Sequence, residues 1–204
     1  MFIVFDGIDG CGKTTQVWKL VKYLFGLSKY VHVLVTREAY KDREIRKFLK
    51  QNESEEKAEK LAELFINDRK EHVEEIIKPM LEKNVVVISD RYKYSTIAFQ
   101  AAQGIEVDRL IKMHENMLIP DFVFILDTPV ETAFKRMQEK IIQKEQKLAE
   151  NKFEENSELL EKVRQNYLQM PKFFPNEKII IIDGSKTIEE IFEEVKKCFE
   201  GLNF

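Results

Sequence analysis

The sequence is poor in the features that mark several large protein classes. Its 204 residues contain only two cysteines, Cys11 and Cys198, and their separation fits no metal-binding or disulfide pattern. No stretch approaches the roughly 18 to 20 consecutive apolar residues of a membrane-spanning helix. Residues 1–5 have the pattern of a core strand, not of a signal peptide. We therefore expect a protein of the reducing cytoplasm that has no membrane partner.

The sequence also lacks an excess of positive charge. The net charge is −3, which argues against a nucleic-acid-binding protein, because such proteins carry an excess of basic residues. An anionic ligand must then be held by local charge, and the planar guanidinium of arginine suits phosphates and base edges better than lysine does. Only eight of the 33 basic residues are arginines, and we expect four of these to be ordinary surface residues: Arg43, Arg46, Arg109 and Arg164.

What the sequence does have is an alternation of short apolar runs with long helical patterns. The apolar runs are nearly continuous, as is typical of strands covered on both faces, and predict strands at 2–5, 31–35, 85–89, 122–126 and 178–182. Helical patterns lie at about 13–26, 42–51, 54–82, 94–102, 106–118, 129–150, 154–169 and 187–200. This alternation predicts an α/β three-layer sandwich, a five-stranded parallel sheet flanked by helices, with ligands beyond the carboxyl ends of the strands.

Two of these helices begin with capping signals. Thr128 precedes Pro129, which predicts an N-cap followed by proline at the first helical position. Thr187 is followed three residues later by Glu190, which is the spacing of a capping box.

No linker or repeat divides the chain, so residues 1–204 are expected to form a single domain. One segment, residues 138–156, is packed with Lys, Glu and Gln and has few apolar residues. It is either a solvated helical hairpin with paired charges or a mobile lid at about 137–156, since few buried contacts mean low local stability. Composition alone does not separate the two.

The most informative motif is Gly7-Ile8-Asp9-Gly10-Cys11-Gly12-Lys13-Thr14-Thr15, which fits the phosphate-binding pattern G-x-x-x-x-G-K-[ST]. It lies between the first apolar run and the first helical pattern, as such a loop should. Glycines let the backbone curl so that successive N–H groups point at phosphate oxygens, and the following helix adds a positive dipole end. Lys13 is then expected at the outer phosphates and Thr14 at a magnesium ion. The alternative is a glycine-rich turn without a ligand.

Charged residues follow two other predicted strands. Asp90 ends the strand at 85–89, at the position that serves magnesium in phosphoryl transfer, and Arg91 beside it is suited to neutralise phosphate charge. The alternative is a buried Asp90–Arg91 pair that closes the strand end. Arg37 follows the strand at 31–35 and either holds an acceptor phosphate or forms a surface salt bridge.

Other candidates are weaker when taken alone. Phe65 and Arg69 are four residues apart and share a helix face, so an aromatic ring could stack on a base whose edge Arg69 binds, although spacing alone favours Phe65 as a core residue. Ser95 and Gln100 either contact a base or decorate a helix. Asp9 is unusual in a phosphate loop because its carboxylate repels phosphate, which suggests a bond to a sugar hydroxyl or help in placing magnesium. The alternative is a solvent-facing loop residue.

Together these motifs resemble the thymidylate kinase family. The resemblance rests on residues 5–16, 36–38, 64–69 and 89–100, and segments 120–121, 126–129, 136 and 163–167 agree with it. It covers essentially the whole chain. The first loop marks only a P-loop NTPase-type fold, whereas the Asp-Arg-Tyr-x-x-Ser element combined with the Phe/Arg helix is far more selective.

The resemblance implies transfer of the γ-phosphoryl group of ATP to dTMP with Mg²⁺, giving dTDP and ADP, in a protein that is usually a homodimer. It assigns the ATP phosphates to Lys13 and the loop from Gly7 to Thr15, with Arg136 near the adenine, and magnesium to Thr14 and Asp90. It assigns dTMP to the following residues: Asp9 at the 3′-hydroxyl, Arg37 and Arg91 at the phosphate, Phe65 stacked on thymine, and Arg69, Ser95 and Gln100 at the base edge.

The chain departs from the family pattern at two places. After Thr-Arg-Glu the family often has Pro-Gly-Gly-Thr, whereas residues 39–42 here read Ala-Tyr-Lys-Asp, so the acceptor loop is expected to be shaped differently. The family also supplies a catalytic basic residue from the phosphate loop or from the lid, and this lid has no arginine. Its candidates are Lys140, Lys144, Lys147 and Lys152, of which Lys152, before Phe153-Glu154, aligns best with the family's Arg-Phe-Glu.

Three alternative functions stay open at this point. Another pyrimidine nucleoside monophosphate kinase, acting on dUMP or UMP, would share everything except the base pocket. A deoxynucleoside kinase would have no need of Arg37 for an acceptor phosphate. A nucleotide-binding regulator without catalysis is favoured only by the missing lid arginines.

Overall fold

The computed structural model describes residues 1–41, 43–49, 55–143 and 152–202. Within them, a five-stranded sheet has the order β2-β3-β1-β4-β5, and every neighbouring pair is parallel. The strands are β1 (Phe2–Asp6), β2 (Val33–Arg37), β3 (Val86–Asp90), β4 (Phe122–Asp127) and β5 (Ile179–Asp183). The predicted parallel sheet and its five strands are therefore confirmed, with ends shifted by one or two residues.

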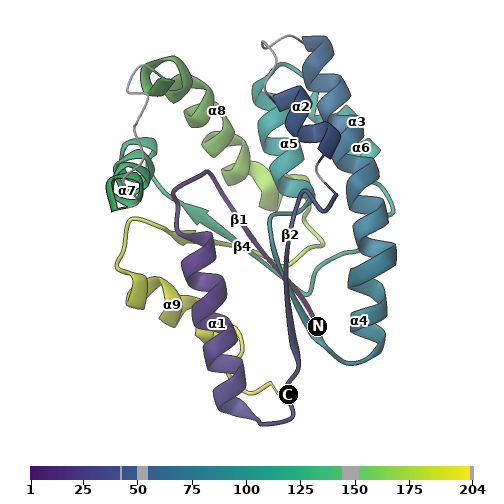
Figure 1. Cartoon of the computed structure of the whole chain (residues 1–204), viewed down its shortest axis with the longest axis vertical. Coiled ribbons are helices and arrows are strands. Elements are labelled where there is room, and N and C mark those ends of the chain that lie inside the picture. The colour runs from purple at the N-terminus through teal and green to yellow at the C-terminus, as the bar shows by residue number, and fades with distance from the viewer. Residues whose placement is uncertain (42, 50–54, 144–151, 203–204) are drawn as a thin grey trace.

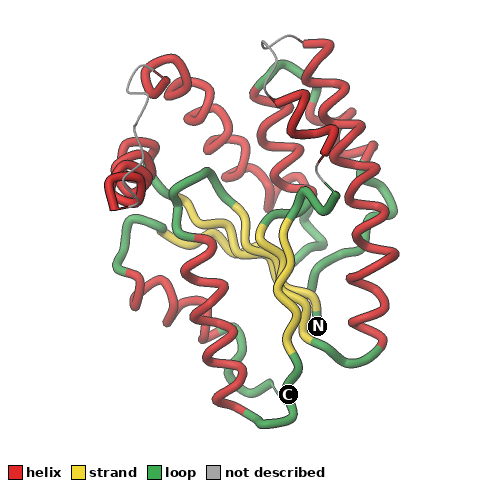
Figure 2. The backbone as a smooth tube through the Cα atoms, viewed as in Figure 1, coloured by secondary structure: helices red, strands yellow, loops and turns green. Residues whose placement is uncertain are grey.

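Helices cover both faces of this sheet, as Figures 1 and 2 show. One face carries α1 (Lys13–Leu27) and α9 (Ile188–Lys197), which pack against each other. The other face carries the remaining large helices, and α5 packs against both α3 and α8 there. The further helices are α2 (Arg43–Leu49), α3 (Glu55–His72), the π-helix η1 (Val73–Ile77), α4 (Lys78–Glu82), α5 (Lys93–Ala102), α6 (Val107–Met113), α7 (Val130–Gln143) and α8 (Lys152–Phe173). The predicted three-layer sandwich is confirmed.

The central strands explain why the apolar runs are continuous. Every residue of β1 and β3 is buried, as parallel strands covered on both faces require. Only the edge strands β2 and β5 have mostly half-buried or exposed residues. All five strands end in a charged residue at the same edge of the sheet, and the register places Arg37 directly opposite Asp90.

Three local predictions need correction. The helix at 54–82 is interrupted by the π-helix η1, and the helix at 106–118 ends at Met113, after which Asn116 has a positive φ of 67°. Thr128 does not cap α7, because the helix begins at Val130 and the buried Thr128 hydroxyl has no hydrogen-bond partner among the described residues. Thr187, in contrast, forms the predicted capping box with Glu190.

The predicted lid at about 137–156 includes the end of one described helix and the start of the next. Helix α7 runs to Gln143 and α8 starts at Lys152, and the two pack against each other (Figure 1). Residues 144–151, with Lys144 and Lys147, lie outside the described residues, as do the side chains of Lys140 and Lys152. Within the described helices, none is both long and apolar enough to cross a membrane.

Candidate functional site

The phosphate-binding motif forms the tight turn between β1 and α1. Gly7, Gly10 and Gly12 all have positive φ angles, of 135°, 82° and 106°, which other residues adopt only with strain. At Gly10, a Cβ atom would lie 2.2 Å from the carbonyl oxygen of Ala133 in α7. The loop is therefore held against α7 by close backbone contact, and a residue with a side chain at position 10 would push the two apart.

Lys13 is folded into this loop. Its buried ammonium donates to the carbonyl oxygens of Gly7 and Ile8, both at 2.9 Å, and lies 3.6 Å from the Sγ atom of the buried Cys11. These partners are neutral, so an anionic phosphate would be a stronger partner for the Lys13 side chain than the two carbonyls. Ile8 and Cys11 contribute buried side chains beneath the loop, and Thr15 lies half-buried in the first turn of α1.

A small cavity of about 170 Å³ opens in front of the loop. It is lined by the following residues: Asp9, Gly10, Gly12, Lys13, Thr14, Arg37, Asp90 and Arg91. The charged members of this set come from the ends of β2 and β3, the turns after β1 and β3 and the start of α1, so the predicted convergence at the carboxyl edge is confirmed. The sequence candidates for phosphate binding lie together at this cavity.

Thr14 and Asp90 meet on one side of the small cavity. The Thr14 hydroxyl donates to Oδ2 of Asp90 at 3.1 Å. The partner of Asp90 is Arg37, whose Nη2 lies 2.5 Å from the same oxygen, and not the adjacent Arg91. The predicted alternative of a closed Asp90–Arg91 pair is therefore wrong, because the two side chains diverge at the strand end. The Arg37 side chain is 62% exposed, so it has room to reorient toward a ligand.

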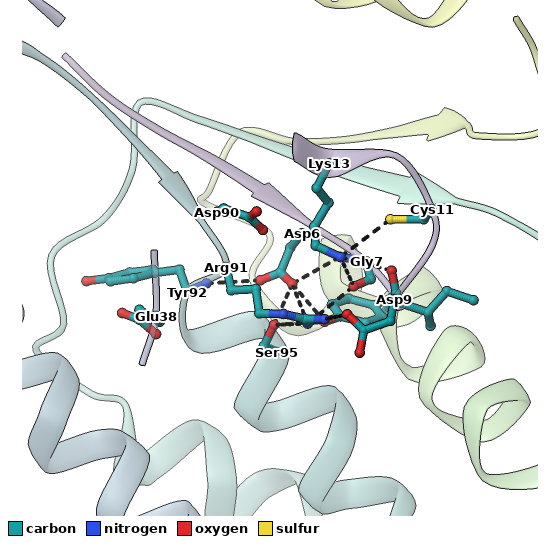
Figure 3. Close-up of polar contacts among 12 residues, drawn as sticks. Asp6, Gly7, Asp9, Cys11, Lys13, Glu38, Asp90, Arg91, Tyr92 and Ser95 are labelled. Atoms are coloured by element: carbon teal, nitrogen blue, oxygen red, sulfur yellow. Dashed lines mark hydrogen bonds and ion pairs between the residues drawn. The ribbon is translucent and has the colours of Figure 1, made fainter. Parts of the chain in front are cut away.

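Arg91 lies at the centre of the site. Its φ of 79° is in the left-handed region, which costs a non-glycine residue of order 1–3 kcal/mol and is typical of functional positions. The guanidinium donates to Asp9 Oδ1 at 2.6 Å and to the Ser95 hydroxyl at 2.9 Å (Figure 3). Partial burial acts to raise the pKa of Asp9, but the charges of Arg91 and Lys13 outweigh it and the pKa is lowered.

Beneath Arg91 lies a buried carboxylate that the sequence motifs did not indicate. Asp6, the last residue of β1, accepts hydrogen bonds from the backbone of Gly7 and Tyr92 and from the hydroxyls of Ser95 and Tyr167. Burial raises the pKa of Asp6, against the opposing charge of Arg91 and the bonds from both hydroxyls. All four partners are donors, which suits an ionised carboxylate, and Asp6 thereby fixes the turn on which Arg91 stands.

A larger cavity of about 350 Å³ adjoins the small one, and Asp9 and Arg91 line both. Its walls are largely apolar and come from α2, α3 and α5, and its remaining lining residues are Glu38, Ala39, Ile45, Leu49, Leu61, Phe65, Arg69, Ser95, Thr96, Phe99, Gln100 and Gln103. Phe65 is half-buried at this wall, so it is not a plain core residue as its spacing alone had favoured. A cavity of this size suits a nucleobase and its sugar.

Arg69 forms the polar floor of the larger cavity. It is 1% exposed and donates through Nε and Nη2 to the carboxylate of Glu38, at 2.5–3.0 Å. Nη2 also donates to the Thr96 hydroxyl, and Nη1 lies 2.8 Å from Nε2 of His114. His114 Nδ1 lies 2.7 Å from the carbonyl oxygen of Leu110, so Nδ1 carries the proton and Nε2 accepts from Arg69. The described residues thus occupy four of the five N–H groups of Arg69, and one at Nη1 remains for a ligand.

The other base-edge candidates differ in their surroundings. Gln100 is buried, its Nε2 donates to Gln103 Oε1 at 3.2 Å, and its own Oε1 has no partner among the described residues. Ser95 also lines the cavity, but its hydroxyl is taken up by Asp6, Arg91 and Tyr167. The position of Ser95 therefore makes it a support for Arg91 rather than a group that faces a base.

The unusual loop after β2 is held by side chains of α3 and η1. The backbone N–H groups of Tyr40 and Lys41 both donate to the Asp68 carboxylate at 2.6 Å. The Tyr40 ring stacks on the buried His72 with centroids 4.9 Å apart and planes within 11°. Lys41 pairs with Glu71 and Glu75. The different composition of this loop is thus matched by a set of contacts that position Glu38 at its start, where the Glu38–Ala39 peptide is cis.

The remaining arginines of the chain differ in their surroundings. Arg136 of α7 donates to the carbonyl oxygen of Gly184 at 2.8 Å, beside the phosphate loop's contact with the same helix. Arg164, expected at the plain surface, is instead 22% exposed and makes a two-pronged bond to Asp127, which ties α8 to the end of β4. Arg109 is exposed and paired with Glu59, as expected, and the side chains of Arg43 and Arg46 are not described.

Comparison with known proteins gives a consistent result. The family model described as "Thymidylate kinase" matches residues 5–195 of this chain. A protein named "Thymidylate kinase" from Fervidobacterium nodosum is 37% identical over 206 residues, which cover 98% of this chain and 99% of that protein. One named "Probable thymidylate kinase" from Thermococcus kodakarensis is 36% identical over 213 residues, covering 99% and 98%. Another of that name from Pyrococcus horikoshii is 37% identical, covering 95% and 93%.

Proposed function

The chain belongs to the thymidylate kinase family, and we propose that it transfers the γ-phosphoryl group of ATP to dTMP, giving dTDP and ADP. The observation that carries this assignment to particular residues is the junction of two cavities at Asp9 and Arg91. The small cavity is polar and faces the phosphate loop, whereas the larger one is mostly apolar. Two nucleotides bound there would meet phosphate to phosphate.

ATP is proposed to bind with its phosphates in the small cavity. The N–H groups of the loop would take the phosphate oxygens, since the backbone curls at Gly7, Gly10 and Gly12 and α1 begins at Lys13. Lys13 would leave its carbonyl partners for the outer phosphates. Arg136, on the helix that contacts Gly10, is proposed near the adenine.

Thr14 and Asp90 fit a magnesium ion. Mg²⁺ prefers hard oxygen ligands and takes only one or two from the protein, with phosphates and water completing its shell. A hydroxyl and a carboxylate oxygen 3.1 Å apart at the phosphate cavity supply such a set once Arg37 turns away. When bound, the ion would neutralise charge that develops on the phosphates.

dTMP is proposed to bind in the larger cavity with its phosphate at Arg91 and Arg37. Phe65 would stack on the thymine ring, and the remaining N–H at Nη1 of Arg69 would meet a carbonyl oxygen at the base edge. Gln100 would meet the base with the amide oxygen that no described residue bonds. Asp9 would accept a hydrogen bond from the 3′-hydroxyl, which accounts for a carboxylate in a phosphate loop.

The chain's part in the reaction is positioning and neutralisation of charge. A phosphate oxygen of dTMP attacks the γ-phosphorus, the bond from that phosphorus to the bridging oxygen breaks, and its electron pair leaves with ADP. Arg91 lies between the two cavities and would stabilise the transferring group. Lys152, at the start of α8, is proposed as the catalytic cation of the lid. Closure of this lid, which residues 137–156 would form, would exclude water from the site.

The remaining expectations rest on the family resemblance. We propose that residues 1–204 act as one kinase domain, that the protein is a cytoplasmic homodimer, and that it uses no nucleic-acid partner. Sedimentation velocity of the purified chain tests the homodimer directly.

Release of ADP from ATP, measured with and without dTMP, tests the proposed function. We expect ADP only when dTMP and Mg²⁺ are both present. Parallel assays with dUMP, UMP and thymidine distinguish a different monophosphate kinase or a deoxynucleoside kinase, because the preferred acceptor gives the highest kcat/KM. Nucleotide binding without any ADP release would indicate a regulator.

A further inference from the structure

Two glutamines one turn apart share the wall of the larger cavity. Gln100 is buried, and the nitrogen of its amide donates to the amide oxygen of Gln103 at 3.2 Å. Its own oxygen has no hydrogen-bond partner among the described residues, although it is buried. An unpaired buried acceptor costs about 1–3 kcal/mol, so its retention points to a donor that arrives with the ligand.

A glutamine amide can present either end to a ligand, and Gln103 determines which end Gln100 presents. While Gln103 offers an oxygen, Gln100 must turn its nitrogen toward Gln103 and its oxygen away from it. Reversing both amides together would preserve their mutual bond but would present the Gln100 nitrogen instead. Arg69, whose N–H groups can only donate, bonds Thr96 one turn before Gln100 on the same face of α5 and lines the same cavity, which favours the Gln100 oxygen on that side.

Among the residues that line the cavity, Gln100 thus has one spare acceptor, Oε1, and Arg69 has one spare donor, the N–H at Nη1 that the described residues leave unbonded. Thymine and uracil present the complementary pair, an N3–H donor next to the O4 acceptor. Cytosine presents the reverse, an N3 acceptor next to an amino donor. A site built to bond one pattern rejects the other strongly, because its buried polar groups are left unpaired.

We propose that Gln103 is a specificity-determining residue, which orients the Gln100 amide so that the site accepts a pyrimidine with a protonated N3 and rejects cytosine. The proposal rests on the proposed function, since it concerns the base of the acceptor nucleotide. Gln103 acts through Gln100 and is a positioning residue, not a catalytic one.

Three variants of Gln103 test this role in the full-length protein. Gln103→Lys offers only donors and so should turn the Gln100 oxygen toward itself and its nitrogen toward the base. Gln103→Leu offers neither a donor nor an acceptor and leaves the Gln100 amide free to rotate. Gln103→Glu is the matched control, because a carboxylate still only accepts. The readout is the ratio of kcat/KM for dTMP to that for dCMP, which cancels any effect of the new charge on binding of the monophosphate.

We expect the ratio to fall at least about tenfold in Gln103→Lys, the equivalent of one hydrogen bond, and by less in Gln103→Leu. Gln103→Glu should keep the wild-type ratio. An unchanged ratio in both Gln103→Lys and Gln103→Leu would overturn the role of Gln103, as would an equal fall in Gln103→Glu. If the wild-type enzyme releases no ADP with dTMP, the proposed function itself fails, which is a distinguishable result.

Discussion

Nη2 of Arg91 lies 2.6 Å from Oδ1 of Asp9, and this ion pair forms the wall that the two cavities share. The Asp9 carboxylate is 68% exposed, whereas Arg91 is held from beneath by Ser95 and, through it, by Asp6. The cation is therefore fixed, and the carboxylate is the partner that a ligand displaces or redirects. Such an arrangement suits phosphoryl transfer, because the positive charge is already in place where the two phosphates would meet.

Removal of either central cation should lower turnover by orders of magnitude without unfolding the protein. We expect Arg91→Ala to lower kcat by about 10³- to 10⁵-fold, because the side chain would stabilise charge on the transferring group. Lys13→Ala should cost at least about 10²-fold. Steady-state kinetics, with thermal unfolding of each variant as the control for folding, measure both effects. A Lys13→Ala enzyme with the kcat of the wild type would contradict the assignment of the phosphate loop.

Arg69 should affect dTMP far more than ATP. We expect Arg69→Ala to raise the KM for dTMP and leave the KM for ATP nearly unchanged. The same change leaves Glu38 buried without its partner, so unfolding free energy should fall by about 3–5 kcal/mol. The variant Glu38→Gln/Arg69→Gln removes both charges and should recover part of that stability but not the dTMP affinity. An unchanged KM for dTMP in Arg69→Ala would disprove the base-edge role.

The contribution of the lid to kcat should depend on one of its four lysines. We expect Lys152→Ala to lower kcat more than Lys140→Ala, Lys144→Ala or Lys147→Ala does, with the KM values little changed. Lys152→Arg should retain activity, since a guanidinium supplies the same charge in a fork. Single-turnover measurement of the chemical step is the most direct assay. Equal losses in all four alanine variants would mean that the lid contributes general charge and no specific catalytic residue.

His114 should make the stability depend on pH. Burial and the charge of Arg69 lower the pKa of His114 to about 3, whereas in the unfolded chain it is about 6.5. Between these values the unfolded state binds one more proton, so this contribution to stability is fully present above pH 6.5 and is lost as pH falls. The slope should reach about 1.4 kcal/mol per pH unit. Urea unfolding at several pH values should show that the free energy of unfolding depends less steeply on pH in His114→Gln than in the wild type. Identical slopes would refute this role of His114.

The five strands were predictable because a short, continuous apolar run between polar segments is typical of a strand buried on both faces. The phosphate loop was equally predictable, since its glycines and Lys13 lie within one short stretch of sequence. Helix ends were less so: the π-helix at 73–77 leaves no mark in the apolar pattern, and Thr128 carries a capping signal that the fold does not use.

The supporting residues of the site could not be read from local patterns. Asp6 and Tyr167 are 161 residues apart, and only the packing of α8 over the sheet brings them together. Arg164 was misassigned because its partner, Asp127, lies on another element. Glu38 left one usable signal: Arg69 is a scarce arginine that shares a helix face with Phe65, a buried arginine requires an acid, and Glu38 stands directly after a strand.

The most direct test is a crystal structure of the protein with dTMP and a non-hydrolysable ATP analogue. We predict thymine between Phe65 and Gln100 in the larger cavity, the triphosphate along the loop from Gly7 to Thr15, and both phosphate ends at Arg91. Thymine bound elsewhere, or two nucleotides whose phosphates do not meet at Arg91, would contradict the two-cavity arrangement on which the mechanism rests.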